Sequence, residues 1–548
     1  MQVITLRLFY FFLLFQISIS AISQVKKPVN YTISGKIKGL SDTTLYLANY
    51  FGKQVFYNDT TRVDSKGNFK FEGKPFNECG KYMILLPSMK RFDFIAADEN
   101  IVIEADTSCT IDKIKIVESA NNKLFFDYIH YINDKIKQRG PIDEVLKNDS
   151  TNTHTEDEKK AAREKLTSLN NEVTAYQKKL IADHPDMLVA KLIKMTMDIE
   201  LPEAPAGMTD DEKKKWSYYY YRSHYWDNCD LADSRLVRDQ AFHKLIEKYV
   251  SQTLPQVPDT MTYFAKQLIE KTKGSEDNFK YIVHHFTYYF ETSKIMCMDE
   301  GFVFMVDNYY SKGLCNSWMK EEKLKAMKEA ADEKRNCLCG EVGPNIILPD
   351  VNEKWTSMYD LDSKYTLLVI WEASCGHCKK EIPKLQELYD KWKDKGLAVY
   401  GVHNNLEVDK WKKFLTEHNI TFKNVSRTQA IMNQDSATKL IYGGVTTLQS
   451  LNYHQYWDVN STPKVYLMDK DHKIIAKSLG ADQLDELLQR LEKGETEIGP
   501  QIQHEYEDED EPAPGKGGSL KPRNQAPPQS PKPGTSAPPK STTPVKKP

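Results

Sequence analysis

The sequence predicts a multidomain fold: an N-terminal β-sandwich-like domain, an all-helical middle domain, a C-terminal α/β domain and a disordered tail. Three observations lead to this prediction. The chain has 548 residues, which is too many for a single hydrophobic core. The spacing of apolar residues changes from alternating to helical near residue 117 and becomes mixed after residue 338. The end of the chain is acidic and then proline-rich, so it has no apolar surface to bury.

Residues 1–23 have the pattern of a signal peptide. A single positive charge precedes an apolar run from Leu8 to Ile19, and Ala21 and Ser23 form a small-x-small cleavage pattern. The apolar run is short for a membrane-spanning helix, so secretion is favoured over an uncleaved anchor. We therefore expect the mature chain to lie outside the cytoplasm, where disulfides persist.

Residues 30–107 are predicted to form a small antiparallel β-sandwich of unknown function. The segments "YTISGKIKGL" and "TTLYLANYF" are short runs of alternating apolar and polar residues. In "RVDSKGNFKFEGK", residues 64–67 supply a turn, so a β-hairpin is expected there. Phe69 and Phe71 should point to the same face of the sheet, because they are two residues apart.

Residues 117–335 are predicted to form an all-helical domain of unknown function. Phe125, Ile129, Ile132 and Ile136 recur at the spacing of one helix face. The same spacing returns in "FHKLIEKYV", "FKYIVHHFTYYF" and "EEKLKAMKEAADEK". No strand pattern interrupts these segments, which favours a purely helical arrangement.

Residues 338–493 show strand and helix patterns in alternation. "KYTLLVIWEA" predicts a buried strand and "CKKEIPKLQELYDKWKDKG" a helix, while "TPKVYLMD" and "KIIAKSLG" predict a hairpin before the last helix. This order is typical of a mixed sheet with helices on both faces. Residues 497–548 follow as an acidic run and then a Pro-rich tail, which should be disordered.

Two cysteines in the sequence Cys375-Gly-His-Cys378 are the strongest chemical signal in the chain. They lie where the predicted strand ends and the helix begins. Unpaired N–H groups and the helix dipole favour negative charge on Cys375 there, and so lower the pKa of its thiol. Cys378, one turn further on, should be buried and can attack a mixed disulfide formed at Cys375. His377 can carry a positive charge that further favours the thiolate.

Further residues surround this pair in a recognisable pattern. Trp371 lies four residues before the first cysteine, Pro383 lies five residues after the second, and Thr462-Pro463 directly precedes a predicted strand. With these features, residues 338–493 resemble the thioredoxin superfamily, and in particular the secreted bacterial thiol-disulfide oxidoreductases of the TlpA/ResA type, which are related to the AhpC/TSA proteins. The resemblance implies a thioredoxin fold and a cis bond before Pro463. It also places Pro463 opposite the cysteines, with Trp371 and Thr462 in the substrate groove.

The resemblance also implies how protons are handled. "CKKEIP" matches the ResA-type pattern, in which Glu381 helps to set the pKa values of the cysteines. Ordinary thioredoxins carry a buried acid six residues before the first cysteine, whereas Val369 occupies that position here. Proton uptake would then fall to Glu381, His377 or water. The β and helical regions resemble uncharacterised modules that precede thioredoxin domains in secreted proteins of gut anaerobes.

Other interpretations of the cysteines are less favoured. A zinc site needs two more ligands beside Cys375 and Cys378, and none is obvious, so we expect neither a metal nor a cofactor. Cys337 and Cys339 are separated by one residue, which would strain a bond between them, so separate structural or free cysteines are expected. All nine cysteines follow the signal peptide, and this odd number leaves at least one free or intermolecular thiol.

The function predicted from the sequence is extracytoplasmic thiol-disulfide exchange that contributes to redox homeostasis, in a bacterial periplasm or cell envelope. The expected partners are protein disulfides or dithiols and an upstream membrane thiol reductant or oxidant. The net charge of −2 excludes a basic nucleic-acid-binding chain, and the mature chain has no second apolar run of membrane-spanning length. One alternative is a redox-responsive envelope interaction protein. A peroxiredoxin-like antioxidant enzyme is disfavoured, since Leu368 and Glu372 replace the Pro and Thr it requires.

Overall fold

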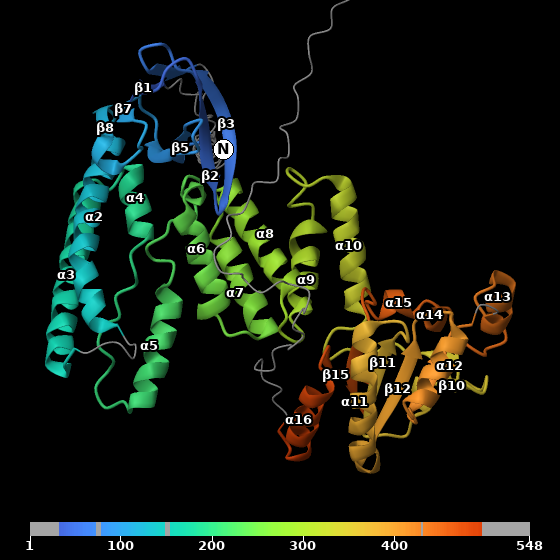
Figure 1. Ribbon diagram of the computed structural model, residues 1–548. Helices are drawn as coiled ribbons and strands as arrows, with labels where there is room; N and C mark the ends of the chain where they lie inside the picture. Colours follow the sequence, from blue (N-terminus) through green and yellow to red (C-terminus); the bar gives the residue numbers. More distant parts are fainter. Residues whose placement is uncertain (1–31, 73–77, 148–153, 429–430, 496–548) are drawn as a thin grey trace, which may run out of the picture. The chain divides into compact units, whose positions relative to one another are not determined.

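Figure 1 shows the computed structural model, which describes residues 32–72, 78–147, 154–428 and 431–495. Strands dominate up to residue 118, helices from 120 to 335, and strands alternate with helices from 347 to 492. This order confirms the predicted fold class of a strand-rich region, a helical middle and a C-terminal α/β domain. The predicted signal peptide (1–23) and the predicted tail (497–548) lie outside the described residues.

The N-terminal region contains two four-stranded sheets, with strand orders β4-β1-β7-β8 and β3-β2-β5-β6. Among the described strands of these sheets, β1 and β7 pair in parallel and the other pairs are antiparallel. Apolar side chains from both sheets form one buried cluster, because alternate residues of each strand face the same side. The strands are β1 (Ile33–Lys38), β2 (Thr44–Phe51), β3 (Gln54–Arg62), β4 (Asn68–Phe71), β5 (Gly80–Leu85), β6 (Arg91–Ala96), β7 (Ile101–Asp106) and β8 (Lys115–Glu118).

The predicted hairpin around residues 64–67 is only partly correct. The turn is present: the N–H of Gly67 donates to the carbonyl oxygen of Asp64 over 3.1 Å, and Gly67 has a φ of +88°. Phe69 and Phe71 are both buried, as expected. However, β3 pairs with β2 in one sheet, whereas β4 pairs with β1 in the other. The local turn signal could not show this, because burial of the two phenylalanines between the sheets selects the partner strand.

The regular elements of the middle region, in its described residues, are helices, and the core lies in the later ones. Phe242, Ile246, Ile282 and Phe286 are fully buried there. In contrast, the buried apolar face predicted for the first long helix does not continue to the end of that helix, since the side chain of Ile136 is 61% exposed. The elements are α2 (Ala120–Leu146), α3 (Glu156–Asp183), α4 (Leu188–Met195), α5 (Asp210–His224), η2 (Leu236–Arg238), α6 (Gln240–Lys248), η3 (Tyr249–Thr253), α7 (Pro258–Glu270), α8 (Glu276–Thr292), α9 (Asp299–Met305), η4 (Val306–Tyr310) and α10 (Glu321–Arg335), after a short η1 (Ile111–Lys113).

The C-terminal domain is built on a five-stranded sheet of order β13-β12-β11-β14-β15. Its central strand β11 (Tyr365–Trp371) is buried along its whole length and pairs in parallel with β12 and antiparallel with β14. The remaining elements are β9 (Ile347–Pro349), β10 (Trp355–Ser357), η5 (Met358–Asp360), α11 (Gly376–Trp392), η6 (Lys393–Lys395), β12 (Leu397–His403), α12 (Val408–Glu417), β13 (Lys423–Ser426), α13 (Gln434–Tyr442), α14 (Leu448–Leu451), α15 (Tyr453–Tyr456), β14 (Lys464–Asp469), β15 (Ile474–Lys477) and α16 (Ala481–Glu492).

Alternate residues of β11 enter two separate cores, as the pleat of a strand requires. Leu367 and Val369 pack in a cluster with residues of α11, α12 and α16. Leu368 and Ile370 pack in a second cluster with residues of α14 and α15. Helices therefore cover both faces of the sheet, which explains why the strand reads as continuously apolar.

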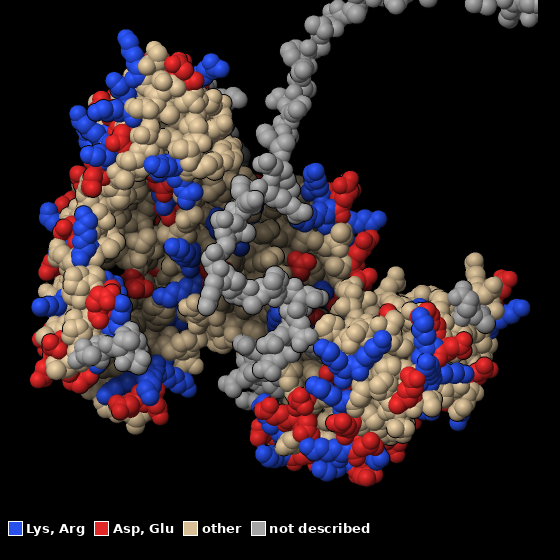
Figure 2. Space-filling model, viewed as in Figure 1, with Lys and Arg blue, Asp and Glu red and all other residues tan. Residues whose placement is uncertain are grey.

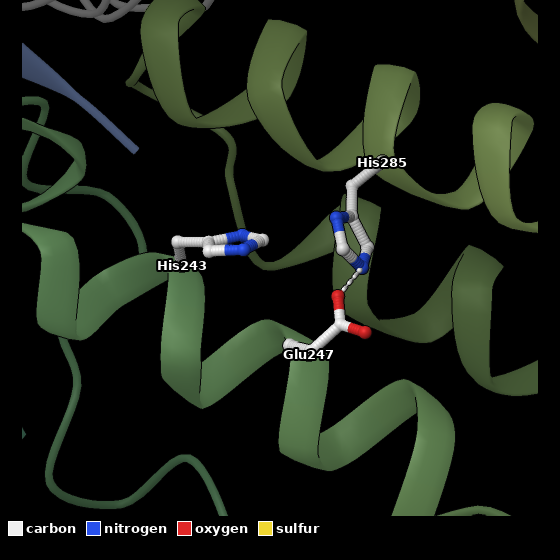
Figure 3. Close-up of side chains that lie close together, drawn as sticks. All are labelled: His243, Glu247 and His285. Atoms are coloured by element: carbon white, nitrogen blue, oxygen red, sulfur yellow. Dashed lines mark ion pairs between the residues drawn. The ribbon is translucent and has the colours of Figure 1, made fainter. Parts of the chain in front are cut away.

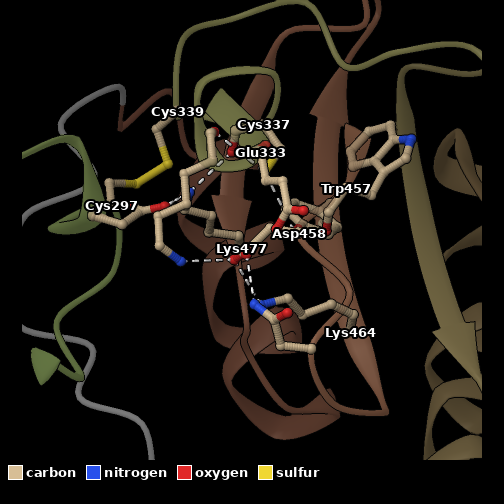
Figure 4. Close-up of polar contacts among 12 residues, drawn as sticks. Cys297, Glu333, Cys337, Cys339, Trp457, Asp458, Lys464 and Lys477 are labelled. Atoms are coloured by element: carbon tan, nitrogen blue, oxygen red, sulfur yellow. Dashed lines mark hydrogen bonds and ion pairs between the residues drawn. A yellow bond between two sulfur atoms is a disulfide. The ribbon is translucent and has the colours of Figure 1, made fainter. Parts of the chain in front are cut away.

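The segment that leads into this domain is held in place by a disulfide and by the contacts of a buried lysine. Cys297, before α9, forms a disulfide with Cys339, which confirms that Cys337 and Cys339 do not pair with each other (Figure 4). Lys477 at the end of β15 is buried, and its Nζ lies 2.5 Å from Oδ2 of Asp299 and 2.9 Å from the carbonyl oxygen of Cys337. A buried ammonium group needs such partners, so these contacts hold residues 297–339 against β15.

The charged surface is mixed in sign. On the face in Figure 2, lysine and arginine side chains are interspersed with aspartate and glutamate. In the described part of the chain, no helix combines the length and apolarity required of a membrane span.

Candidate active site

The two cysteines of the Cys-Gly-His-Cys sequence lie at the start of α11, just after the end of the central strand β11. Cys375 is the N-cap residue of α11, and its Sγ accepts a hydrogen bond from the backbone N–H of Cys378 over 3.4 Å. Cys375 is partly exposed, whereas Cys378 is fully buried. One thiol is therefore accessible to a partner, and the other lies behind it.

The protein environment separates the pKa values of the two thiols. Burial alone would raise the pKa of Cys375, but hydrogen bonds from Cys378, from the side chain of Thr462 and from the backbone of His377 hold it below its ordinary value. Burial raises the pKa of Cys378 to about 12. The accessible thiol thus carries the stronger tendency to ionise, as expected for a sulfur at a helix N-terminus. This asymmetry suits one thiol for attack and the other for a later step.

The loop before β14 completes one side of the cysteine site. The Thr462-Pro463 peptide bond is cis, as the resemblance implied. The Cys375 thiol donates to the carbonyl oxygen of Thr462 over 3.3 Å. The backbone of this loop is thereby within hydrogen-bonding reach of the accessible sulfur, although 87 residues separate Thr462 from Cys375 in the sequence.

Glu381 and His377 occupy different environments on α11. Glu381 is half-buried, and its Oε1 accepts a 2.6 Å hydrogen bond from the backbone N–H of Ala481 at the start of α16. An acidic side chain is favourable at that position, because the first N–H groups of a helix have no intrahelical acceptor. His377 is exposed beside Cys375. Glu381 therefore joins two helices in addition to any part it has in proton transfer.

The expectation that Trp371 lines the substrate groove is wrong. Its side chain is fully buried, and its indole N–H donates to Oδ1 of Asn424 over 3.1 Å. The ring packs against Phe414 of α12, with the ring centroids 5.1 Å apart. Trp371 follows Val369 by two residues on β11 and enters the same core. Its spacing from the cysteines matches the motif, but the strand pleat directs the indole inward.

A polar network beside the cysteines was not predicted. One carboxylate oxygen of Glu372 accepts from Nδ2 of Asn404 over 3.1 Å, and the hydroxyl of Tyr453 donates to Oδ1 of the same amide over 2.9 Å. The backbone of Glu372 also contacts the Cys378 thiol. Asn404 follows β12 directly, so the carboxyl ends of two parallel strands bring it to this site, where such folds bind ligands. This rule about the carboxyl ends of parallel strands could have pointed to Asn404 from the sequence.

The difference between the two thiols predicts their alkylation as a function of pH. Cys375 should react with iodoacetamide at pH values below about 8.5, the ordinary pKa of a thiol. Cys378 should stay unmodified in the folded protein, because it is buried and its pKa is raised to about 12. Peptide mass spectrometry of each residue, with the urea-unfolded chain as the reference, measures both profiles. Equal rates for the two cysteines would refute the assignment of their roles.

Three protein families match successive parts of the chain. Residues 339–477 match the AhpC/TSA family. Residues 31–125 and 153–334 match two families described only as domains of unknown function, DUF4369 and DUF5106. The last two matches agree with the uncharacterised modules expected from the sequence, and they supply no activity.

Individual relatives resemble parts of the chain. Thiol-disulfide oxidoreductase ResA from Bacillus cereus is 26% identical over 162 residues, which cover 29% of this chain and 82% of that protein. The thioredoxin domain of a thiol-disulfide oxidoreductase from Bacteroides vulgatus is 29% identical, with a TM-score of 0.23, and covers 28% of this chain and 96% of that one. A thioredoxin-like protein from Bacteroides caccae is 20% identical, with a TM-score of 0.38, over 54% of this chain and 98% of that one. Together with the cysteine site, the family match and the ResA relatives show that the C-terminal domain is similar to the thiol-disulfide oxidoreductases of the TlpA/ResA type.

Proposed function

We propose that this chain exchanges disulfides with other proteins outside the cytoplasm, through the dithiol of Cys375 and Cys378. The observation that carries the proposal is the asymmetry of the two thiols. One sulfur is accessible, accepts an N–H hydrogen bond and has a lowered pKa, and the other is fully buried with a raised pKa. A structural pair would not need this difference.

In the reducing direction, the exchange has two steps. The Cys375 thiolate attacks one sulfur of a substrate disulfide, forms a mixed disulfide and releases the other sulfur as a thiolate. Cys378 then loses its proton and attacks Sγ of Cys375, which forms the Cys375–Cys378 disulfide and releases the second substrate thiolate. Two electrons pass from the dithiol to the substrate, and the two protons of the dithiol neutralise the released thiolates. Substrate oxidation is the same sequence in reverse.

The loop at Thr462 and Pro463 is the proposed wall of the substrate groove. The accessible thiol already contacts the Thr462 carbonyl, so an extended substrate segment beside this loop would present its disulfide to Cys375. A membrane-bound thiol reductant or oxidant would then restore the dithiol or the disulfide after each turnover.

A turnover assay with a glutathionylated peptide and dithiothreitol tests the proposed activity. The wild-type chain should accelerate deglutathionylation, and Cys375→Ser should reduce the rate to that of dithiothreitol alone, since the attacking sulfur is absent. A wild-type rate equal to the uncatalysed one would favour a redox-responsive interaction protein instead. Recovery of the chain in the envelope fraction without residues 1–23 tests the location, and recovery in the cytoplasm with these residues intact would contradict it.

Glu381 is proposed to transfer protons to and from the dithiol, because Val369 replaces the buried acid of ordinary thioredoxins. In Glu381→Gln, the amide oxygen can still accept from the N–H of Ala481, so the contact with α16 is retained. The same turnover assay across pH should then show a displaced profile with an unchanged circular dichroism spectrum. An unchanged profile would assign this role to water or His377.

A further inference from the structure

A group of three potential metal ligands lies in the helical region, in the part of the chain whose family has no known function. His243 and Glu247 are four residues apart on α6, so both side chains project from the same face of that helix. His285 projects from α8 toward them (Figure 3). One potential ligand atom from each residue lies within 4.8 Å of the others. No metal was expected from the sequence, because only the cysteine pair was considered and no further ligands were evident beside it; His243 and His285 are 42 residues apart.

The contact between His285 and Glu247 has the separation of two ligands on one ion. Nε2 of His285 lies 3.5 Å from Oε2 of Glu247. This nitrogen is buried, and within the described residues it has no hydrogen-bond partner. Ligands of a tetrahedral zinc ion at distances of about 2.1 Å lie about 3.4 Å apart. The distance between the two atoms is thus slightly long for a good hydrogen bond, and it suits two ligands that bind the same cation.

The protonation of the histidines also suits metal binding. Burial lowers the pKa of His285 to about 3 and also lowers the pKa of His243. Metals bind the neutral form of imidazole, so the burial of these two rings is compatible with the arrangement of ligand atoms described above.

A second contact orients the ring of His243. The Tyr281 hydroxyl lies 3.0 Å from Nδ1 of His243. If Nδ1 carries the proton and donates to Tyr281, Nε2 keeps its lone pair for a metal, which is the usual arrangement around ligating histidines. The positive charge of Lys53 acts on both histidines and opposes the binding of a cation beside them. Because Lys53 is exposed, solvent screens its repulsion.

We propose that His243, Glu247 and His285 bind one divalent transition-metal ion of the zinc class. Two imidazole nitrogens and one carboxylate oxygen form a donor set that is well known for zinc, and three protein ligands leave a fourth position for water. His285 also lines a cavity of about 760 Å³ together with Tyr281 and His284. The fourth position would be supplied with water or a small ligand from this cavity. Nothing in this proposal depends on the activity of the cysteine pair.

Zinc titration of the mature chain tests the site. The Cys375→Ser/Cys378→Ser background removes the adjacent pair of thiols, which would otherwise compete for the ion. Isothermal calorimetry with zinc chloride should give one equivalent per chain, and Co²⁺ should give the visible absorption of a four-coordinate ion without a thiolate charge-transfer band. Glu247→Gln and His285→Ala should each weaken zinc binding at least tenfold, as expected for removal of a ligand.

His284→Ala is the matched control. It removes a neighbouring, exposed histidine from the same cavity while leaving the three ligands intact, so it should bind zinc like the parent. Glu247 is about half-exposed, so Glu247→Gln should fold normally. It therefore tests the site even if His285→Ala fails to fold. Absence of a zinc equivalent in the parent, or equal affinity in the parent and Glu247→Gln, would overturn the proposal. A loss in His284→Ala equal to that in His285→Ala would do the same.

Discussion

Cys378→Ser should accumulate covalent adducts with its protein substrates. Cys375 still attacks in this variant, but the thiol that resolves the mixed disulfide is missing, so the intermediate persists. Expressed in its native envelope, the variant should show bands of higher mass on non-reducing gels, and dithiothreitol should abolish them. Wild type should show few such bands, since Cys378 lies one helical turn from the attacked sulfur. The difference in adduct bands between Cys378→Ser and wild type should be nearly complete, because the variant lacks the step that resolves the mixed disulfide.

The other cysteines of the chain require a control for this experiment. Seven of the nine cysteines lie outside the Cys297–Cys339 disulfide, and Cys79 and Cys109 are partly exposed like Cys375. The double variant Cys375→Ser/Cys378→Ser retains every other thiol, so its bands show the background of unrelated pairing. Adducts found in Cys378→Ser and absent from the double variant are the specific ones. Identical bands in both variants would show that exchange does not occur at this pair.

Removing the Cys297–Cys339 disulfide should cause a large loss of stability. The bond closes a segment with a sequence separation of 42, for which the loss of chain entropy in the unfolded state is worth about 4 kcal/mol. Cys297→Ser/Cys339→Ser should therefore unfold at a clearly lower urea concentration than wild type. The midpoint is measured by tryptophan fluorescence under non-reducing conditions, and replacing both cysteines avoids an unpaired thiol.

Two comparisons make this result specific to the disulfide. Wild type treated with dithiothreitol should fall to the midpoint of the double variant, whereas the variant itself should change little. Cys109→Ser, which replaces a partly exposed free thiol elsewhere in the chain, should unfold like wild type. A double variant as stable as wild type would mean that Lys477 and its contacts with Asp299 and Cys337 suffice to hold this segment.

The sequence by itself determined the organisation of the chain and the local placement of the cysteine pair. The predominantly apolar run of β11 and the turn at residues 64–67 are local patterns, and both are present in the structure. The placement of Cys375 at a helix N-terminus is also local, because it depends only on where one strand ends and one helix begins. Features that depend only on residues close together in the chain could therefore be predicted directly from the sequence.

Only the tertiary structure decided which distant residues meet. Trp371 enters the core because of the pleat and the helices that cover it, although its spacing from the cysteines suggested a groove. Asn404 reaches Glu372 because two parallel strands end side by side. Cys339 pairs with Cys297, and His285 faces Glu247, through packing of segments far apart in the chain. Such contacts depend on how separate elements bury their apolar surfaces together, and no local pattern encodes that.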